Sequence, residues 1–314
     1  MFEILLHHEG LEDWCSQVNT LYASEFHLTC VPQTADLLLI EEWPKIDILW
    51  HVLAPVNKVH LEAAKSLRLI QKLGVGVNTI DLEAAKMRGV AVCNLPGVNS
   101  NTVAEFTLGL MLSALRRFAY LHNHVRNGEW AIPPDKVVGL HELHRKIVGV
   151  VGFGSIGQRV AHLVSAFDAE VVYWSRTERS SHLGRQVLLE DLFATSDIVS
   201  LHIPVTEETR LLVGRGLLRR AKPGMILVNT ARGELVDEAA LLEALDSGIV
   251  SIAALDVFAN EPLTHDSRIL QHPNVLPTPH VAWLTTDCLL ACRELALLNG
   301  RQLAAGLPLL NRVA

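Results

Sequence analysis

Residues 147–157 decide the fold of this chain and read Ile147-Val148-Gly149-Val150-Val151-Gly152-Phe153-Gly154-Ser155-Ile156-Gly157. The apolar first part predicts a buried strand, the G-x-G-x-x-G pattern predicts a turn, and the amphipathic stretch Gln158–Phe167 predicts a helix. Gly152 permits the tight turn, Gly154 lets the backbone approach a pyrophosphate, and Gly157 lets the helix pack closely on the strand. The helix N-terminus adds partial positive charge for phosphates. Together these features predict a dinucleotide-binding unit, whereas the glycine pattern alone would be weak evidence.

The end of the next predicted strand indicates which dinucleotide is bound. Glu170–Trp174 is followed by Ser175, Arg176 and Thr177, where an acidic residue would normally hold the ribose 2′-hydroxyl of NAD. An arginine and small hydroxyls can pair with a 2′-phosphate, which a carboxylate would repel. We therefore expect NADP(H) to be favoured, with NAD(H) possible. The alternative is that Arg176 is a solvated surface arginine.

Composition narrows the class of protein. The chain has 314 residues, 49% hydrophobic and 19% charged, as expected of an ordered globular protein with one large or two medium domains. A net charge of −7 without a Lys/Arg-rich run argues against a nucleic-acid partner. The chain has neither a stretch long enough to span a membrane nor the start of a signal peptide. We expect a cytoplasmic protein without a membrane partner.

The cysteines give no sign of a metal site. They are odd in number, scattered and without metal-ligand spacing. Because the chain is expected to be cytoplasmic, we expect all of them to be reduced thiols. They are Cys15, Cys30, Cys93, Cys288 and Cys292.

The first hundred residues alternate between predicted strands and helices. This α/β pattern predicts a parallel sheet with helices on both faces. Helices are expected at Leu61–Lys65 and at Leu82–Met87, the second with Asp81 as N-cap. Strands are expected at Glu3–Leu6, Asp36–Ile40, Asp47–Val52 and Leu67–Ile70.

A long apolar helix over residues 99–117 separates this part from a second α/β unit that begins at Lys146. The glycine turn therefore lies in mid-chain, which predicts two doubly wound parallel-sheet units with the crevice between them as substrate site. The C-terminal helix Asp287–Leu303 is expected to return to the first unit. Strands of the second unit are expected at Ile147–Val151, Glu170–Trp174, Ile198–His202, Met225–Asn229 and Ile252–Val257.

Arg232 follows one of these strands, and the carboxyl ends of strands face the ligand crevice in open α/β sheets. A guanidinium there can bind a carboxylate in bidentate fashion. Arg232 could instead be a surface residue at a helix start. Asp256 lies within an apolar strand, where a carboxylate needs a partner.

Glu261 and His280 follow on connections stiffened by proline. A His–carboxylate pair suits acid–base chemistry, because the carboxylate orients the imidazole ring. In a chain with 15 histidines, His280 taken alone would more often be structural.

Over almost its whole length the chain resembles the D-isomer-specific 2-hydroxyacid dehydrogenases. The matching runs follow one order, so their combination is specific although each is weak alone. They are Lys72–Asp81, Asn94–Asn99, Val103–Glu105, Val151–Gly157, Leu201–Pro204, Lys222–Gly224, Asn229–Gly233, Leu255–Phe258, Glu261-Pro262 and Pro279-His280.

The resemblance implies three catalytic residues. Arg232 would bind the substrate carboxylate and polarise the keto group. His280 would donate a proton to the carbonyl oxygen, and Glu261 would hold and tune His280. The backbone amides of Val75 and Gly76 would also bind the carboxylate.

The resemblance also implies the cofactor site. Asp256 would hold the nicotinamide carboxamide, with Thr230 and Ala231 lining that end, while Ser155 and Ile156 would contact the pyrophosphate. Ser175 stands where the family more often has aspartate, and the Ser-Arg-Thr run resembles NADPH-preferring glyoxylate and hydroxypyruvate reductases. The other expected cofactor-binding positions are Gly152, Gly154, Gly157, Arg176 and Thr177 and, on the adenosine side, His202, Pro204 and Thr209.

The family fold implies a Rossmann NAD(P)-binding domain over residues 99–281, inserted into a flavodoxin-like substrate domain over residues 1–98 and 282–314. The resemblance further implies a homodimer that forms through Asn99–Val138.

We expect a reductase of small 2-keto acids such as glyoxylate or hydroxypyruvate, with His280 as acid/base. The loop Trp50–Pro55 would face the substrate side chain with Lys72 and Trp283 nearby, although Trp50 and Trp283 could equally be packing aromatics. Two alternatives remain. The same fold could act on another small anion, such as phosphoglycerate, phosphite or formate, or the chain could be a dinucleotide-sensing, corepressor-like binding protein.

Overall fold

The computed structural model describes residues 1–8, 11–134, 137, 139–178 and 180–314. It divides the chain into two compact units. Unit 1 comprises Met1–Asn99 and Thr285–Ala314, and unit 2 comprises Ser100–Leu284. Within the described residues, no helix combines the length and apolarity needed to cross a membrane.

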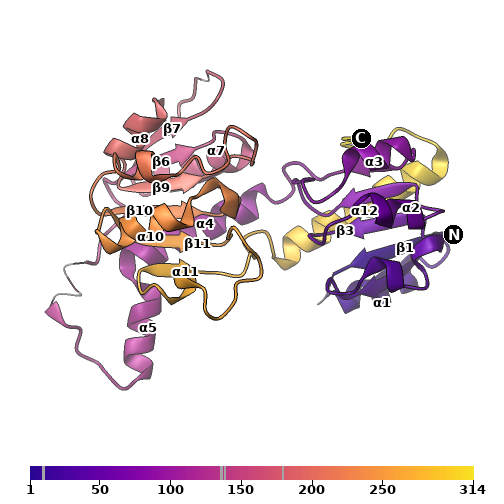
Figure 1. Cartoon of the computed structure of the whole chain (residues 1–314), viewed down its shortest axis with the longest axis horizontal. Helices are drawn as coiled ribbons and strands as arrows, with labels where there is room; N and C mark the ends of the chain where they lie inside the picture. The colour runs from indigo at the N-terminus through magenta and orange to yellow at the C-terminus, as the bar shows by residue number, and fades with distance from the viewer. Residues whose placement is uncertain (9–10, 135–136, 138, 179) are drawn as a thin grey trace. The chain divides into compact units, whose positions relative to one another are not determined.

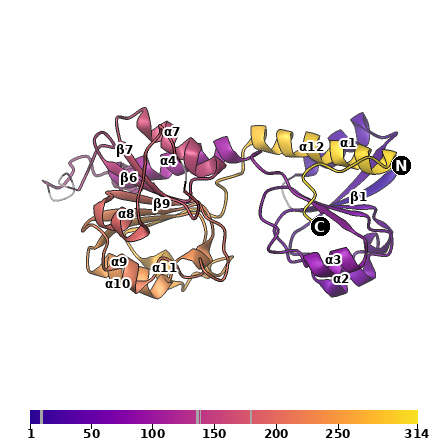
Figure 2. The same cartoon turned by 90° about the horizontal axis from the view of Figure 1, so that it is seen from above.

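Unit 1 contains a five-stranded, wholly parallel sheet with the order β2-β1-β3-β4-β5. Figure 2 shows α1 and α12 on one face of this sheet and α2 and α3 on the other. The order is that of a flavodoxin-like fold. The elements are β1 (Phe2–His7), α1 (Glu12–Leu21), β2 (Phe26–Val31), β3 (Ile48–His51), α2 (Lys58–Ala63), β4 (Leu69–Lys72), α3 (Leu82–Met87), β5 (Ala91–Cys93) and α12 (Thr286–Ala305).

Alternation along the strands gives this sheet two apolar faces. Leu5, Leu49 and Ile70 pack in the core that includes residues of α2 and α3. On the opposite face the Trp50 ring meets the Trp14 ring of α1 edge-on, with centroids 5.9 Å apart. Trp50 is fully buried, so it is a packing aromatic and not the wall of a substrate pocket.

Two local expectations in unit 1 have different outcomes. Asp81 does cap α3, since its carboxylate accepts a hydrogen bond from the Ala84 N–H at 2.9 Å. The strand expected at Asp36–Ile40 is wrong, because this segment forms a 3₁₀ turn. The Asp36 carboxylate accepts from the Leu38 N–H at 2.9 Å and closes the turn, a local bond that competes with extended structure.

The expectation of reduced thiols is also wrong for one pair. Cys15 of α1 and Cys30 of β2 form a disulfide, with their Cα atoms 6.3 Å apart. The two cysteines lie 15 positions apart in the sequence, and only the packing of α1 beside β2 brings them together. Cys93, Cys288 and Cys292 are buried and form no disulfide.

Unit 2 contains a seven-stranded parallel sheet with the order β12-β11-β10-β9-β6-β7-β8. The order reverses at β6, the strand that leads into the glycine turn, which is the Rossmann arrangement. The strands are β6 (Ile147–Val151), β7 (Glu170–Trp174), β8 (Arg185–Gln186), β9 (Ile198–Leu201), β10 (Met225–Asn229), β11 (Val250–Leu255) and β12 (Val275–Pro277).

Helices cover both faces of the second sheet (Figure 2). Met111 of α4 and Val160 of α7 pack on Val148 and Val150 of β6, whereas the other face carries a separate core with residues of α8 and α10. The helices are α4 (Ser100–Arg116), α5 (Phe118–Arg126), α7 (Ser155–Ser165), α8 (Leu189–Thr195), α9 (Arg215–Leu218), α10 (Glu238–Asp246) and α11 (Arg268–Gln271).

The segment that follows α4 carries exposed apolar side chains. Figure 1 shows α5 projecting away from the seven-stranded sheet. Phe118, Val125 and Trp130 are 52%, 51% and 86% exposed. Three positions of the arm expected to form a dimer, Asp135, Lys136 and Val138, lie outside the described residues.

Candidate functional site

The glycine turn between β6 and α7 has the geometry of a phosphate-binding loop. Gly152 has φ +98°, and a Cβ there would lie 2.5 Å from the carbonyl oxygen of His202. A Cβ on Gly157 would collide with the carbonyl oxygen of Gly152. Both positions therefore require glycine, one for the turn and one for close contact of helix and strand.

Gly154 differs from these two, because a Cβ there would meet no protein atom within 4 Å. It is the N-cap residue of α7, and Ser155 opens the helix. Backbone N–H groups at such a helix start bind phosphate oxygens. The open space at Gly154 thus fits a pyrophosphate lying over the turn, with Ser155 and Ile156 beneath it.

A tight turn of polar residues ends β7. The Ser175 hydroxyl donates to the Thr177 carbonyl oxygen at 2.5 Å, and the Gln186 amide of β8 donates to the Ser175 carbonyl oxygen at 3.2 Å. Arg176 is exposed. The carboxyl end of β7 therefore presents a guanidinium next to a hydroxyl on an ordered turn.

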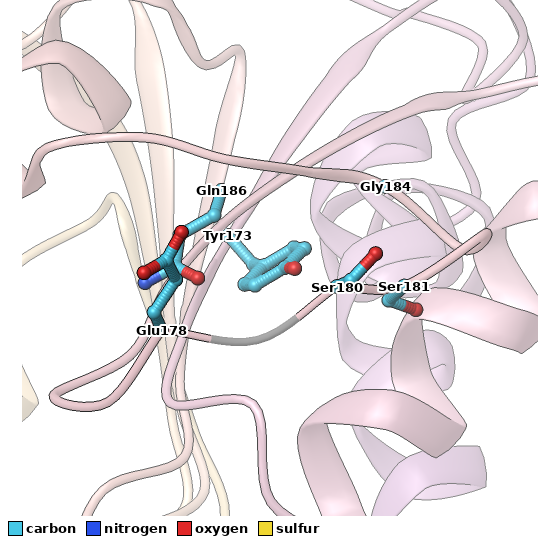
Figure 3. A pocket seen from close by; sticks show the side chains of 6 residues that line it. All are labelled: Tyr173, Glu178, Ser180, Ser181, Gly184 and Gln186. Atoms are coloured by element: carbon cyan, nitrogen blue, oxygen red, sulfur yellow. The ribbon is translucent and has the colours of Figure 1, made fainter.

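A pocket of about 510 Å³ adjoins this turn. Figure 3 shows the Tyr173 ring between Glu178 and Gln186 on one side and Ser180 and Ser181 on the other. Gly184 completes the lining. Polar side chains make up most of the pocket wall, and Glu178 contributes a carboxylate to it.

A second turn follows β9 and lies beside Arg176. The Thr209 hydroxyl donates to the Pro204 carbonyl oxygen at 2.7 Å. A hydrogen bond from the Thr206 hydroxyl, with the charge of Arg176 as a smaller contribution, holds the pKa of Glu208 below its usual value. Arg176, Pro204 and Thr209 thus belong to one edge of unit 2, beside the glycine turn.

The imidazole ring of His202 is hydrogen-bonded within the protein. Its Nε2 lies 2.8 Å from the Ser200 hydroxyl oxygen, and burial lowers the pKa of His202 to about 3. The imidazole is therefore neutral at pH 7, and the backbone carbonyl of His202 is the part that approaches Gly152.

Arg232 stands at the carboxyl end of β10. The Asn229 amide donates to its carbonyl oxygen at 2.8 Å, and its own guanidinium donates to the Ala231 carbonyl oxygen at 2.6 Å. Burial lowers the pKa of Arg232 against the opposing charges of Glu234 and Glu261. Arginine keeps its proton even when it is buried. Arg232 is therefore a cation that is largely shielded from water.

Next to Arg232, Gly233 is in such close contact with the Phe258 carbonyl group that a Cβ would collide with it. The Phe258 N–H donates to Glu261 Oε1 at 2.9 Å. This contact ties the Arg232 segment to the loop that carries Glu261.

Glu261 and His280 form the carboxylate–imidazole pair expected of an acid–base site. Glu261 Oε2 lies 2.6 Å from His280 Nδ1. Burial would raise the pKa of Glu261, but hydrogen bonds from His280 and the Phe258 N–H, with the charges of His280 and Arg232, hold it below its usual value. An ionised Glu261 accepts the proton of Nδ1, which leaves Nε2 as the nitrogen that exchanges a proton with a ligand.

Asp256 is fully buried just beyond β11. Its carboxylate accepts hydrogen bonds from the Thr278 hydroxyl at 2.6 Å, from the Val281 N–H at 3.0 Å and from the Ala282 N–H at 2.9 Å. These three hydrogen bonds satisfy a side chain that has no exposed surface in this structure, so the contact of Asp256 with a carboxamide stays a prediction.

Thr230 and Ala231 adjoin these residues in unit 2. The Thr230 hydroxyl oxygen is 2.9 Å from that of Thr107 in α4, and the Ala231 N–H donates to the Asn229 side chain at 3.0 Å. From the sequence alone no role was expected for Thr107, Asn229 or Thr278, whose side chains contact Thr230, Ala231 and Asp256. Asn229 begins the matching run Asn229–Gly233, and Thr278 lies two residues before His280, so both were next to expected site residues.

The residues expected to bind the substrate through their backbone lie in unit 1. Val75 and Gly76 follow β4, and Val75 is 41% exposed. The Asn94 amide donates to the Val75 carbonyl oxygen at 2.9 Å, and the Leu95 N–H donates to the Gly74 carbonyl oxygen at 2.8 Å. These two bonds fasten the loop to the segment after β5 and leave Val75 at the surface of unit 1.

Comparison with known proteins gives one family. Residues 108–282 match the model of the D-isomer specific 2-hydroxyacid dehydrogenase, NAD binding domain. A D-3-phosphoglycerate dehydrogenase from Archaeoglobus fulgidus is 38% identical over 88% of this chain, which spans only 53% of that relative's length. A hydroxypyruvate reductase from Thermotoga maritima is 38% identical over 78% of this chain and 80% of its own.

Solved structures have the same fold as this chain over nearly its full length. The TT0316 protein from Thermus thermophilus has a TM-score of 0.90 at 33% identity and covers 99% of this chain and 100% of its own. A formate dehydrogenase from Staphylococcus aureus in complex with NAD has a TM-score of 0.88 at 26% identity, covering 100% and 99%. An acyclic imino acid reductase in complex with NADPH and D-Arg has a TM-score of 0.86 at 26% identity, covering 99% and 100%.

Proposed function

Because this chain belongs to the D-isomer specific 2-hydroxyacid dehydrogenases, we propose that it reduces small 2-keto acids with a nicotinamide dinucleotide. The observation that carries the proposal is the pairing of Glu261 with His280 at 2.6 Å, in the same unit as Arg232 and the glycine turn. The bound dinucleotide would supply the hydride that adds to the keto carbon.

In this proposal His280 is the general acid. Glu261 fixes the Nδ1 proton and stabilises the imidazolium, so that Nε2 presents a proton to the carbonyl oxygen as negative charge develops there. Arg232 binds the substrate carboxylate, for which its planar guanidinium is suited. The backbone N–H groups of Val75 and Gly76 in unit 1 are proposed as further substrate-binding groups.

We propose the following cofactor-binding residues in unit 2, and the geometry of the glycine turn supports the proposal. Gly152, Gly154 and Gly157 would shape the pyrophosphate site with Ser155 and Ile156. Asp256 is proposed to accept from the nicotinamide carboxamide, beside Thr230 and Ala231. At the adenosine end we propose Ser175, Arg176 and Thr177, bordered by His202, Pro204 and Thr209.

We propose that NADP(H) is favoured over NAD(H), because the exposed Arg176 at the end of β7 can pair with a 2′-phosphate. Replacing Arg176 with alanine should raise the KM for NADPH about 10-fold or more, since hydrogen bonds to charged groups contribute about 1.5–3 kcal/mol. The KM for NADH should change less than about 2-fold. Steady-state kinetics with both cofactors measures the ratio.

The matched control is Arg219→Ala, which removes an exposed arginine at the end of α9. It should leave both constants unchanged. Equal loss for NADPH and NADH in the Arg176 variant, or a parent protein that already prefers NADH, would contradict the cofactor preference.

The Glu261–His280 pair sets the expected pH dependence of reduction. The pKa of Glu261 is lowered, so its ionised form persists as pH falls through the usual glutamate range near about 4.3 and is lost only below it. We therefore expect kcat/KM for keto-acid reduction to hold its value as pH falls through that range and to decline through Glu261 only below it.

Profiles of kcat/KM against pH, with folding checked by circular dichroism at each pH, measure where the acidic limb lies. The apparent pKa values from such profiles belong to the coupled pair and not to either residue alone. Glu261→Gln should lower the whole profile and remove its acidic limb. An acidic limb at or above the usual glutamate pKa in the parent protein would count against the assignment.

For the substrate we propose a compact 2-keto acid such as glyoxylate or hydroxypyruvate, the latter in line with the name of one relative. Phosphoglycerate chemistry is a second candidate, because another relative carries that name. A panel of glyoxylate, hydroxypyruvate and phosphohydroxypyruvate with NADPH and NADH separates them by kcat/KM. Formate and phosphite with the oxidised cofactors test the other small anions.

Turnover of any keto acid would rule against a purely dinucleotide-sensing role. Cofactor binding without turnover of a panel member would favour it.

We propose a homodimer, for which the exposed apolar side chains of α5 and of Trp130 offer a surface. A cytoplasmic location is also proposed. In that location the Cys15–Cys30 disulfide would have to persist. Titration of the thiols of this protein, taken from freshly lysed cells, measures whether the disulfide is present.

A further inference from the structure

The loop that carries His280 is hydrogen-bonded to one buried carboxylate, that of Asp256. Thr278 donates its hydroxyl to Asp256 Oδ1 at 2.6 Å, and the backbone N–H groups of Val281 and Ala282 donate to Oδ1 and Oδ2 at 3.0 and 2.9 Å. The three donors lie on both sides of His280 in the sequence. Asp256 is fully buried, so these hydrogen bonds replace the water that its carboxylate lacks.

The backbone of the same loop is fixed as well. The His280 N–H donates to the Asp256 carbonyl oxygen at 2.9 Å, and the Thr278 N–H donates to the Leu255 carbonyl oxygen at 2.9 Å. His280 itself has φ +55°. That left-handed conformation is uncommon for a residue with a side chain and persists where the surroundings impose it.

These contacts have a direct consequence for the imidazole. The backbone conformation of His280 sets the direction of its Cα–Cβ bond, and Nδ1 of its ring lies 2.6 Å from Glu261 Oε2. Among the residues that the structure describes, Thr278 is the one side-chain donor to the Asp256 carboxylate. The hydroxyl of Thr278 therefore completes the clamp on the His280 loop.

We propose that Thr278 is a positioning residue for catalysis, which acts through Asp256 to hold His280 in register with Glu261. The proposal rests on the proposed function in that His280 is the general acid. It assigns Asp256 a role in holding the loop besides any contact with the nicotinamide. A shift of the imidazole by about 1 Å can cost about 100-fold in rate.

The test compares Thr278→Val with Thr278→Ser. Valine has the shape of threonine without the hydroxyl, whereas serine keeps the donor. We expect Thr278→Val to lower kcat for keto-acid reduction about 10- to 100-fold. Thr278→Ser should recover most of kcat.

Thr195→Val is the control for loss of a threonine hydroxyl in unit 2. The Thr195 hydroxyl donates to the Asp191 carbonyl oxygen at an exposed site on α8, so this variant should keep the parent kcat. A Thr278→Val protein with the parent kcat would overturn the proposal. So would equal loss of kcat and of NADPH binding in the valine and serine variants, which would indicate a purely structural role.

A substrate-free measurement keeps this proposal separate from the proposed function. The Nδ1 proton of an imidazole bound to a carboxylate gives a downfield proton NMR signal, assignable through its loss in His280→Ala. The signal should be present in the parent and in Thr278→Ser and absent or broadened in Thr278→Val. If no keto acid is turned over but the signal behaves in this way, the clamp stands and the proposed function fails. An unchanged signal in Thr278→Val refutes the clamp.

Discussion

Replacing His280 with alanine should lower kcat for 2-keto acid reduction by about 10²- to 10⁴-fold, the usual contribution of a general acid. The variant loses the group that protonates the carbonyl oxygen, while the glycine turn and Arg176 are untouched. Binding of NADPH, measured by fluorescence titration, should therefore remain at the parent level. The measurement is single-turnover oxidation of enzyme-bound NADPH after addition of hydroxypyruvate.

His272→Ala provides a matched control. His272 also pairs with a carboxylate, Asp246, at 3.4 Å, but it follows α11 and plays no part in the proposed chemistry. It should keep the parent rate. Equal losses in the two variants would mean that a histidine–carboxylate pair matters for folding of unit 2 and not for proton transfer.

Replacing Arg232 with glutamine should lower kcat/KM for the keto acid by about 10²- to 10³-fold. Glutamine keeps a hydrogen-bond donor but removes the charge and the paired N–H groups, and loss of one partner of a buried charge pair costs about 2–5 kcal/mol. Because the substrate carboxylate is its proposed partner, most of the loss should appear in KM, with a smaller part in kcat from weaker polarisation of the keto group.

Arg215→Gln is the corresponding control, since Arg215 pairs with Glu243 at an exposed site and such pairs contribute little. Arg232→Lys should recover only part of the activity, because an ammonium cannot form the bidentate contact. Full activity of Arg232→Gln would refute the role of Arg232 in substrate binding.

Much of the fold follows from local signals. The glycines of the 152–157 turn, the apolar β6 and the Asp81 cap each act through contacts within a few residues, so the sequence predicts them. The parallel sheets follow from the α/β alternation, and the flavodoxin-like and Rossmann topologies follow from the resemblance to the family. No strand was expected at β2 or β5. The pairing of Glu261 with His280 joins residues 19 positions apart and came from the family motif.

Other features depend on tertiary packing that no local pattern encodes. The leucines at 37–39 look like a strand, but the Asp36 side chain closes a turn. Cys15 and Cys30 meet only because α1 packs beside β2. Trp50 lies on the α1 face of the sheet, and the Thr278–Asp256 bond spans 22 positions.

The most direct test of the central claim is oxidation of NADPH on addition of hydroxypyruvate or glyoxylate to parent and His280→Ala proteins, each first shown to bind NADPH. We predict oxidation by the parent protein and a rate lower by about 10²-fold or more in the variant. Equal rates in both proteins, or no oxidation by the parent with any 2-keto acid, would contradict the account.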